Sequence, residues 1–167
     1  MDIKLVRVVS ASSDALRDVD NIFADLTAYS QRVDGVARRN HAAHEFATAL
    51  PPGRELRHKY AFLAKVGNVA VGLADIIEDY PSRGTAFIGL LAVRETAQGS
   101  GVGRKLFQKV ERFARNELEA RTMQLAVVEA NPVIGFWAKM GFHPTGEVKP
   151  FEGETLKSHS ILMEKEL

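Results

Sequence analysis

Residues 90–107 read LLAVRETAQGSGVGRKLF, an apolar run that leads through three alternating glycines into a segment with helical spacing. Glycine is costly at the start of a helix because it loses more backbone freedom on folding than any other residue. Gly99, Gly101 and Gly103 therefore need a reason. A strand that turns through glycines into a helix builds an anion site, since the first helical N–H groups have no intrahelical partner and the helix dipole favours negative charge. The stretch predicts a phosphate-binding turn with Arg104 beside it; a tight turn that binds no ligand is the alternative.

Two common nucleotide motifs fit this turn poorly. The loop of nucleoside triphosphatases needs Gly-Lys-Ser/Thr, whereas Gly103 is followed by Arg104 and Lys105. The dinucleotide fingerprint needs G-x-G-x-x-G directly after a strand, whereas G-x-G-x-G begins here six residues after Val93. A nicotinamide-dependent enzyme remains a lesser alternative, in which Glu129 would hold the ribose.

The segments around the turn predict one mixed α/β domain over residues 1–167. Short apolar or β-branched runs predict strands at residues 3–9, 60–66, 69–77, 86–93, 123–128 and 158–163. Helical spacing of apolar residues predicts helices after the N-cap candidates of residues 10–14, over residues 38–49, from residue 102 onward, and from Asn131-Pro132 to Gly141.

Composition narrows the function. The net charge of +1 in 167 residues argues against nucleic acid or a membrane as a partner. The chain has no cysteine, which excludes disulfides and a thiolate nucleophile. The first residues lack a signal-peptide pattern and no apolar run has the length of a membrane span, so we expect a cytoplasmic protein. His41, His44 and Glu45 form H-x-x-H-E, which matches no common metal motif, so we expect no metal.

Two blocks carry a family resemblance. Leu91 to Val93 followed by Gln98-x-x-Gly101-x-Gly103 is similar to the cofactor motif of the GNAT superfamily of N-acetyltransferases, in which a strand ending in L-x-V precedes Gln/Arg-x-x-Gly-x-Gly/Ala. The stretch NPVIGFWAKMGF, residues 131–142, resembles the second block of that superfamily, N-x-x-A-x-x-F-Y-x-K-x-G-F. The two blocks occur in the expected order with a strand between them.

The resemblance implies a central mixed, mostly antiparallel sheet of about six or seven strands flanked by about four helices. It also implies an acetyl-CoA-dependent N-acetyltransferase, in which an amine attacks the thioester directly in a ternary complex. Asn131 would contact the cofactor near its thiol end, or serve only as a helix cap. The cofactor-binding residues implied in this way are Leu91, Ala92, Val93, Gln98, Gly99, Ser100, Gly101, Val102, Gly103, Arg104, Asn131 and Phe136.

Because the sequence departs from the family pattern at several positions, it does not identify the general acid or the general base of the reaction. Trp137 replaces the tyrosine that often protonates the leaving thiolate, and an indole N–H is no useful acid; alternatively, Trp137 is a core residue. Gly89 and Ala126 stand where relatives often carry a glutamate base. The remaining candidates for a base are Asp75, Glu78, Asp79 and Glu129.

These departures also motivate an alternative function, a GNAT-like module that binds acyl-CoA with little turnover. The sequence selects neither the length of the acyl group nor the acceptor, which we expect to be a small-molecule or peptide amine. Many relatives dimerise, so a homodimer is an expectation of the resemblance alone.

Overall fold

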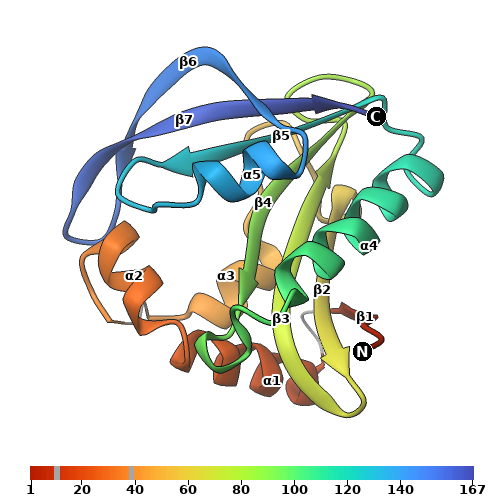
Figure 1. Cartoon of the computed structure of the whole chain (residues 1–167), viewed down its shortest axis with the longest axis vertical. Coiled ribbons are helices and arrows are strands. Elements are labelled where there is room, and N and C mark those ends of the chain that lie inside the picture. Colours follow the sequence, from red (N-terminus) through yellow and green to blue (C-terminus); the bar gives the residue numbers. More distant parts are fainter. Residues whose placement is uncertain (10–11, 38–39) are drawn as a thin grey trace.

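The computed structural model describes residues 1–9, 12–37 and 40–167. Within these residues seven strands form one sheet in the order β1-β2-β3-β4-β5-β7-β6 (Figure 1). All neighbouring strands there are antiparallel except β4 and β5, which are parallel. The mixed, mostly antiparallel sheet is thus confirmed. The strands are β1 (Lys4–Val8), β2 (Lys59–Val66), β3 (Val69–Glu78), β4 (Thr85–Val93), β5 (Thr122–Val128), β6 (His143–Glu152) and β7 (Lys157–Glu166).

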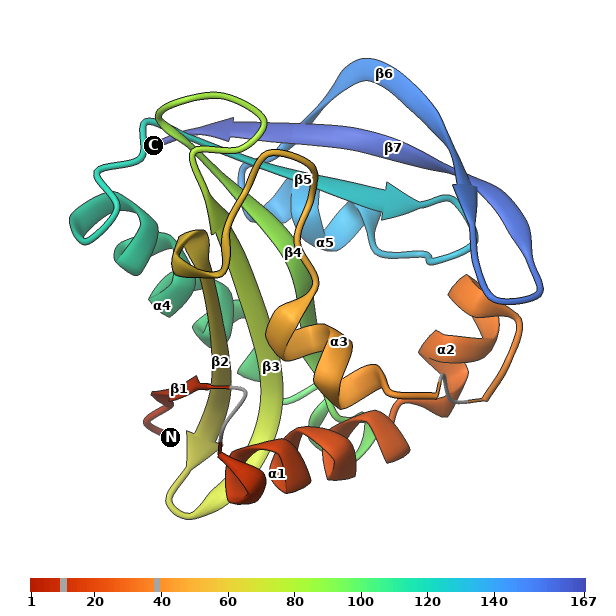
Figure 2. The ribbon, with the colours of Figure 1, turned by 180° about the vertical axis from the view of Figure 1, so that it is seen from behind.

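The helices cover both faces of the sheet. Helices α1 and α3 lie on the face seen in Figure 2, whereas α4 and α5 lie on the opposite face, seen in Figure 1. Helix α4 also forms the crossover that two parallel strands require. The described helices are α1 (Ser13–Ala24), α2 (Thr27–Asp34), α3 (Ala42–Thr48), α4 (Val102–Asn116) and α5 (Ile134–Lys139), with short 3₁₀ turns at Leu56–His58 and Glu95–Ala97.

Each face has its own apolar core. Val102, Leu106 and Val110 of α4 are almost fully buried against the sheet, as their spacing of four residues predicts. On the other face, Val19 and Ile22 of α1 pack with Leu63 and Leu73. The sheet is therefore buried on both faces at β2, β3 and β4, which explains why those strands read as nearly continuous apolar runs.

Some predicted elements differ from the structure. Helix α2 was not predicted. Two of its three buried residues, Ser30 and Asp34, are polar, so the helix shows no apolar stripe. Helix α3 begins at Ala42, whereas a start at residue 38 was predicted. Residues 38 and 39 lie outside the described residues. Strand β6 was also missed, because nearly all of its residues are exposed and therefore leave no apolar pattern. Predicted N-cap residues 10 and 11 are likewise outside the described residues, and Ser12 is the N-cap of α1.

A gap opens in the middle of the sheet. Strands β4 and β5 pair only from Thr85 to Ile88 of β4, and the rest of β4 has no register with β5. On its other edge β4 carries one extra residue, because Asp75 of β3 pairs with Leu90 whereas Ile76 pairs with Ile88. The residue left over is Gly89. Such a bulge bends a strand and increases its twist. The bulge at Gly89 directly follows Ile88, the last residue of β4 that pairs with β5.

None of the helices in the described part of the chain is both long and apolar enough to cross a membrane.

Candidate active site

The turn between β4 and α4 has the geometry of an anion site. Gly99 and Gly101 have φ angles of +77° and +83°, a left-handed conformation that side-chain-bearing residues rarely adopt. Gly101 is the N-cap of α4 and has no side chain with which to cap it. Gln98 Nε2 donates to the Val93 carbonyl at 2.9 Å, which ties the turn to the end of β4. The first N–H groups of α4 are therefore presented without a side-chain cap.

The third glycine of the turn, Gly103, is not required by its surroundings. A Cβ built on Gly103 would lie 3.6 Å from the Phe136 ring, which is an ordinary contact. Alanine would therefore fit at this position, in agreement with the Gly/Ala choice of the family motif.

A cavity of about 720 Å³ lies between this turn and the parted ends of β4 and β5. We call it the turn cavity. It is lined by ten of the twelve residues predicted to bind a cofactor: Leu91, Ala92, Val93, Gln98, Gly99, Gly101, Gly103, Arg104, Asn131 and Phe136. The side chains of the other two point to structural roles. Ser100 Oγ donates to the Ala97 carbonyl at 2.6 Å, and Val102 is buried in the core.

Asn131 is not the cap of α5. That helix begins at Ile134 after the N-cap Val133, which makes no side-chain cap bond. Asn131 instead forms a turn, since its N–H donates to the Val128 carbonyl and its carbonyl accepts from the Val133 N–H, both at 2.8 Å. The helix-cap interpretation is thus wrong, and the predicted contact with a cofactor remains open. Asn131 also lies one position closer to Phe136 than the family pattern has it.

Trp137 belongs to the core and to the cavity wall at once. Its side chain packs edge-on against Phe107, Phe136 and Phe142, with ring centroids 5.0 to 5.7 Å apart. It is 6% exposed and also lines the turn cavity. This packing explains the tryptophan as a structural residue, without any role as a proton donor.

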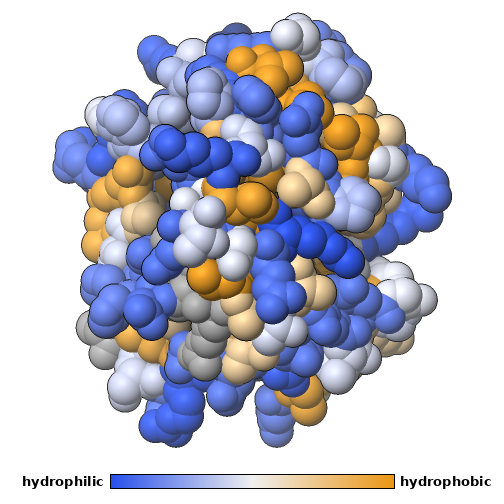
Figure 3. All heavy atoms as spheres, turned by 90° about the vertical axis from the view of Figure 1, so that its left-hand side faces the viewer, coloured by the Kyte–Doolittle hydropathy of each residue, from blue (hydrophilic) through white to orange (hydrophobic). Residues whose placement is uncertain are grey.

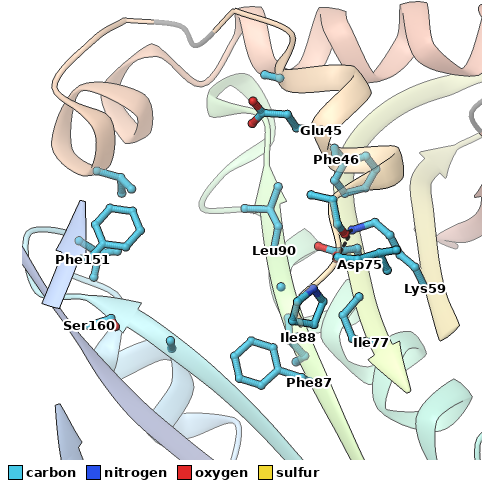
Figure 4. A pocket seen from close by; sticks show the side chains of 18 of the residues that line it. Glu45, Phe46, Lys59, Asp75, Ile77, Phe87, Ile88, Leu90, Phe151 and Ser160 are labelled. Atoms are coloured by element: carbon cyan, nitrogen blue, oxygen red, sulfur yellow. Dashed lines mark hydrogen bonds and ion pairs between the residues drawn. The ribbon is translucent and has the colours of Figure 1, made fainter. Parts of the chain in front are cut away.

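A second cavity, of about 490 Å³, lies on the α1 and α3 side of the sheet. We call it the aromatic cavity, because the rings of six residues line it: Phe23, Tyr29, Phe46, Tyr80, Phe87 and Phe151. Figure 4 shows Phe151 and Ser160 on the opposite side of this cavity from Phe46, Lys59 and Asp75. The two cavities meet in the gap of the sheet, since the same five residues line both of them: Tyr29, Ile88, Gly89, Leu90 and Ala126.

Of the four carboxylates predicted as candidate bases, Asp75 is the one that lines either of these two cavities. Glu78 accepts a hydrogen bond from the Tyr60 hydroxyl at 3.1 Å, and Asp79 accepts one from the Gly84 N–H at 2.7 Å. Glu129 is exposed, and its carboxylate lies 3.8 Å from His159 Nδ1. The contacts of these three are those of structural or surface carboxylates.

Asp75 forms a buried ion pair. Lys59 Nζ lies 2.9 Å from Asp75 Oδ2, and the two side chains are 4% and 6% exposed. Lys59 also donates to the Ala49 carbonyl at 2.9 Å. Burial raises the pKa of the Asp75 carboxyl, while the Lys59 ammonium and the Leu90 N–H act in the opposite direction. Sequence reasoning missed Lys59 because a lysine at the start of a strand gives no signal of burial.

The Asp75 carboxylate occupies the space beside Gly89. A Cβ built on Gly89 would lie 2.7 Å from Asp75 Oδ2 and 2.9 Å from Oδ1. Position 89 is where relatives often carry a glutamate. Here a carboxylate from the neighbouring strand fills the same region, and glycine leaves the room for it.

The H-x-x-H-E motif lies at the start of α3. His41 and His44 are exposed, while Glu45 lines the aromatic cavity. Among the described residues no three side chains of the metal-ligating types come together.

Comparisons with known proteins agree with this geometry. The sequence model of the acetyltransferase (GNAT) family matches residues 23–142. No curated protein matches the chain. An acetyltransferase from Thermus thermophilus has a similar structure, with a TM-score of 0.77 and 22% identity over 100% of this chain and 98% of that one.

Two further solved structures are similar. A chimera of the spermidine N-acetyltransferase from Vibrio cholerae and hSSAT has a TM-score of 0.72 and 16% identity over 99% of this chain and 96% of that one. The ribosomal-protein-S18-alanine N-acetyltransferase from Escherichia coli has a TM-score of 0.68 and 16% identity over 99% and 94%. At these identities the likeness concerns the fold, whereas the family match covers most of the chain. The chain therefore belongs to the acetyltransferase (GNAT) family, and it is an acyltransferase.

Proposed function

We propose that this acyltransferase moves an acetyl group from acetyl-CoA to a primary amine. The observation that supports the proposal most strongly is that two cavities of different character meet at the parted strands β4 and β5. One cavity contains the glycine turn, which presents backbone N–H groups without a side-chain cap. The other has six aromatic rings in its lining and holds a buried carboxylate. A long cosubstrate with phosphates at one end suits the first cavity, and a smaller amine suits the second.

The residues of the turn cavity fit coenzyme A. Backbone N–H groups at the start of α4, together with Arg104, would hold the pyrophosphate. Leu91 to Val93 have no register with β5, so their backbone can pair with the pantetheine arm. When bound, acetyl-CoA supplies a thioester carbonyl as the electrophile. A nicotinamide cofactor has no comparable support, because the glycine spacing and the family match both favour coenzyme A.

The proposed reaction is a direct attack. The chain has no cysteine to form an acetyl thioester of its own, so the amine attacks the substrate carbonyl in a ternary complex. Gly89 is left out of the β3 register, so its backbone can serve as a hydrogen-bonding group at the gap. The rate comes mainly from positioning and from backbone donors near the carbonyl oxygen.

Departure of the thiolate does not require Trp137 as an acid. A thiol with a pKa of about 8.5 leaves readily compared with an alkoxide, and water or the amine itself can supply the proton. The missing tyrosine therefore costs part of the rate without abolishing the reaction. This reasoning favours turnover over a module that only binds acyl-CoA.

Thermal unfolding in the presence of ligands tests the proposed cosubstrate. At one hundred times its Kd, a ligand specific for the folded state adds about 2.7 kcal/mol to the free energy of unfolding, a shift of about 5–10 °C. We expect this shift with CoA and acetyl-CoA and none with NAD. Initial velocities should then give intersecting lines when acetyl-CoA and an amine are varied together. A shift with NAD alone, or parallel lines of the ping-pong type, would contradict the proposal.

A further inference from the structure

We infer that the aromatic cavity takes a primary amine with a compact apolar body, and that Asp75 receives the ammonium group of that amine and removes its proton. This inference rests on the proposed function, since it names the acceptor class and the base of the same reaction. Four observations carry it: the place of Asp75, its ion pair with Lys59, the aromatic lining, and a contact that closes one side of the cavity.

Asp75 stands at the junction of the two cavities. Both of its oxygens lie within 3 Å of the position that a Cβ of Gly89 would occupy, and Gly89 lines both cavities. A carboxylate offers about four acceptor sites. The Lys59 ammonium and the Leu90 N–H use two of them. The carboxylate therefore has capacity left for a donor that arrives from the aromatic cavity.

Lys59 is the positioning residue for this carboxylate. Its bonds to Asp75 Oδ2 and to the Ala49 carbonyl fix the ammonium between β3 and the end of α3. The other titratable side chains that face the cavity are Tyr29, Asp34 and Tyr80, with Glu45 on α3. Lys59 contacts Asp75 directly, so after burial this lysine has the largest effect on the pKa of Asp75.

The base step begins with transfer of one proton from the ammonium to the Asp75 carboxylate. The net charge of the site does not change in this transfer, because the Lys59 ammonium keeps its charge. Burial raises the pKa of Asp75 and so makes the carboxylate a stronger base, whereas the Lys59 ammonium acts in the opposite direction. The free amine lone pair then forms the C–N bond while the C–S bond breaks. The nitrogen loses a second proton, so one proton ends on the departing thiolate and the other reaches solvent.

The lining sets the character of the rest of the acceptor. Phe23 and Phe46 pack edge-on at 6.2 Å, and Tyr80 and Phe87 do so at 5.4 Å, so aromatic rings from several elements flank the space. A volume of about 490 Å³ suits a small molecule. An apolar body buries its surface against these rings, whereas a second charged group would lose its hydration there unless it paired with Asp34 or Glu45.

Helix α2 and the β6–β7 hairpin close one side of this cavity. The Thr155 N–H donates to the Asp34 carbonyl at 2.8 Å, and Val33, Asp34 and Phe151 line the cavity at this contact. The fit is tight, because a Cβ on Gly153 would collide with the Val33 carbonyl. Figure 3 shows this side of the molecule, where apolar and polar side chains are interspersed and form no single broad apolar face. A peptide chain would need an open groove here, whereas a compact amine does not.

A panel of amines tests the acceptor class. Wild-type protein with saturating acetyl-CoA is assayed with 2-phenylethylamine, spermidine and trialanine, and kcat/KM is taken from release of the CoA thiol. We expect 2-phenylethylamine to exceed the other two by at least about tenfold. Equal or better use of spermidine or trialanine would overturn the inference while leaving the proposed function intact. Failure to bind acetyl-CoA, measured by calorimetry on the same sample, would instead overturn the proposed function.

Variants test the role of Asp75. We expect Asp75→Asn to lower kcat/KM for 2-phenylethylamine by about 100-fold, with the Kd for acetyl-CoA unchanged. The matched control is Glu147→Gln, a half-exposed carboxylate on β6, which should stay within about twofold of wild type. Because Asp75→Asn leaves a buried lysine unpaired, the double variant Lys59→Met with Asp75→Asn is measured beside it. If either variant binds acetyl-CoA and keeps wild-type kcat/KM, Asp75 is not the base.

Discussion

The Asp75 carboxylate lies where a side chain on Gly89 would begin, 2.7 Å from the position of the missing Cβ. Two neighbouring strands thus share one small volume, and the glycine on β4 makes room for the acid on β3. Gly89 stands where relatives often carry a glutamate, and here the carboxylate of Asp75 occupies the space beside it. This relationship makes Gly89 the most sensitive point at which to test the site.

Gly89→Ala should displace the Asp75 carboxylate, because the new methyl group cannot share that space. We expect kcat/KM for the amine to fall by about tenfold or more, since small misplacements at a reacting centre are costly. The measurement is steady-state kinetics with calorimetry of acetyl-CoA on the same variant. Gly135→Ala is the control, because a Cβ at Gly135 meets open space. Similar losses in both variants would show that the contact with Asp75 has no special effect.

The pH dependence of the reaction should report the Lys59–Asp75 pair. Burial raises the pKa of Asp75, so the base loses its charge as the pH falls through a value above the ordinary one of about 3.9. Activity should therefore decline on the acid side. In Lys59→Met, loss of the neighbouring positive charge should move that decline upward by about one pH unit or more. A profile of log kcat/KM against pH that is unchanged in Lys59→Met would contradict this role for the lysine.

Stability should follow the same pair with a defined sign. Lys59→Met leaves a buried carboxylate without its partner, which costs about 3–5 kcal/mol near neutral pH. A folded-state pKa raised above the unfolded value contributes stability that is present at low pH and lost as the pH rises through the folded-state pKa. The deficit of Lys59→Met should thus shrink toward pH 4. Urea denaturation at several pH values measures it, and a deficit that grows on acidification would exclude this explanation.

Two glycines of the same turn, Gly101 and Gly103, should respond differently to replacement by alanine. Gly101→Ala forces a side chain into a left-handed conformation and should cost about 1–2 kcal/mol of stability, with a weaker Kd for CoA. Gly103→Ala makes only an ordinary contact with Phe136 and should be tolerated. Thermal unfolding with and without CoA measures both effects. Equal tolerance of the two changes would mean that the backbone conformation at Gly101 is not what the turn requires.

Gly153→Ala should loosen the contact between α2 and the β6–β7 hairpin. The new methyl group would collide with the Val33 carbonyl, so the two segments must move apart. We expect the preference for 2-phenylethylamine over trialanine to decrease by about threefold or more, since the preference depends on the fit of the cavity. The ratio of the two kcat/KM values is the readout, with Gly135→Ala as the control. An unchanged ratio in a folded variant would show that this contact does not limit the acceptor.

The sequence predicted the parts of the fold that depend on local pattern. The apolar runs of β2 to β5 and the stripe on α4 specify buried elements, and the glycine spacing specifies the turn between β4 and α4. Helix α2 and strand β6 could not be predicted, since Ser30 and Asp34 are buried polar residues and β6 is exposed. Their places depend on contacts with distant segments, such as the bond from Thr155 to Asp34.

The site was predictable to a similar degree. Ten of the twelve predicted cofactor-binding residues line the turn cavity, and eight of those ten come from the single stretch 91–104. The pairing of Asp75 with Lys59 and its position beside Gly89 arise from the strand register and from the bulge in β4. No spacing along the chain reports such a relationship, so Asp75 could be named only as one of four carboxylates.

The decisive measurement is release of the CoA thiol from acetyl-CoA by wild-type protein, with and without 2-phenylethylamine, and with detection of the acetylated amine by mass spectrometry. We predict amine-dependent release well above the hydrolysis blank, and one molecule of N-acetyl product for each thiol released. Tight binding of acetyl-CoA with no amine-dependent release, for this amine and for spermidine and trialanine, would contradict the proposed acetyl transfer.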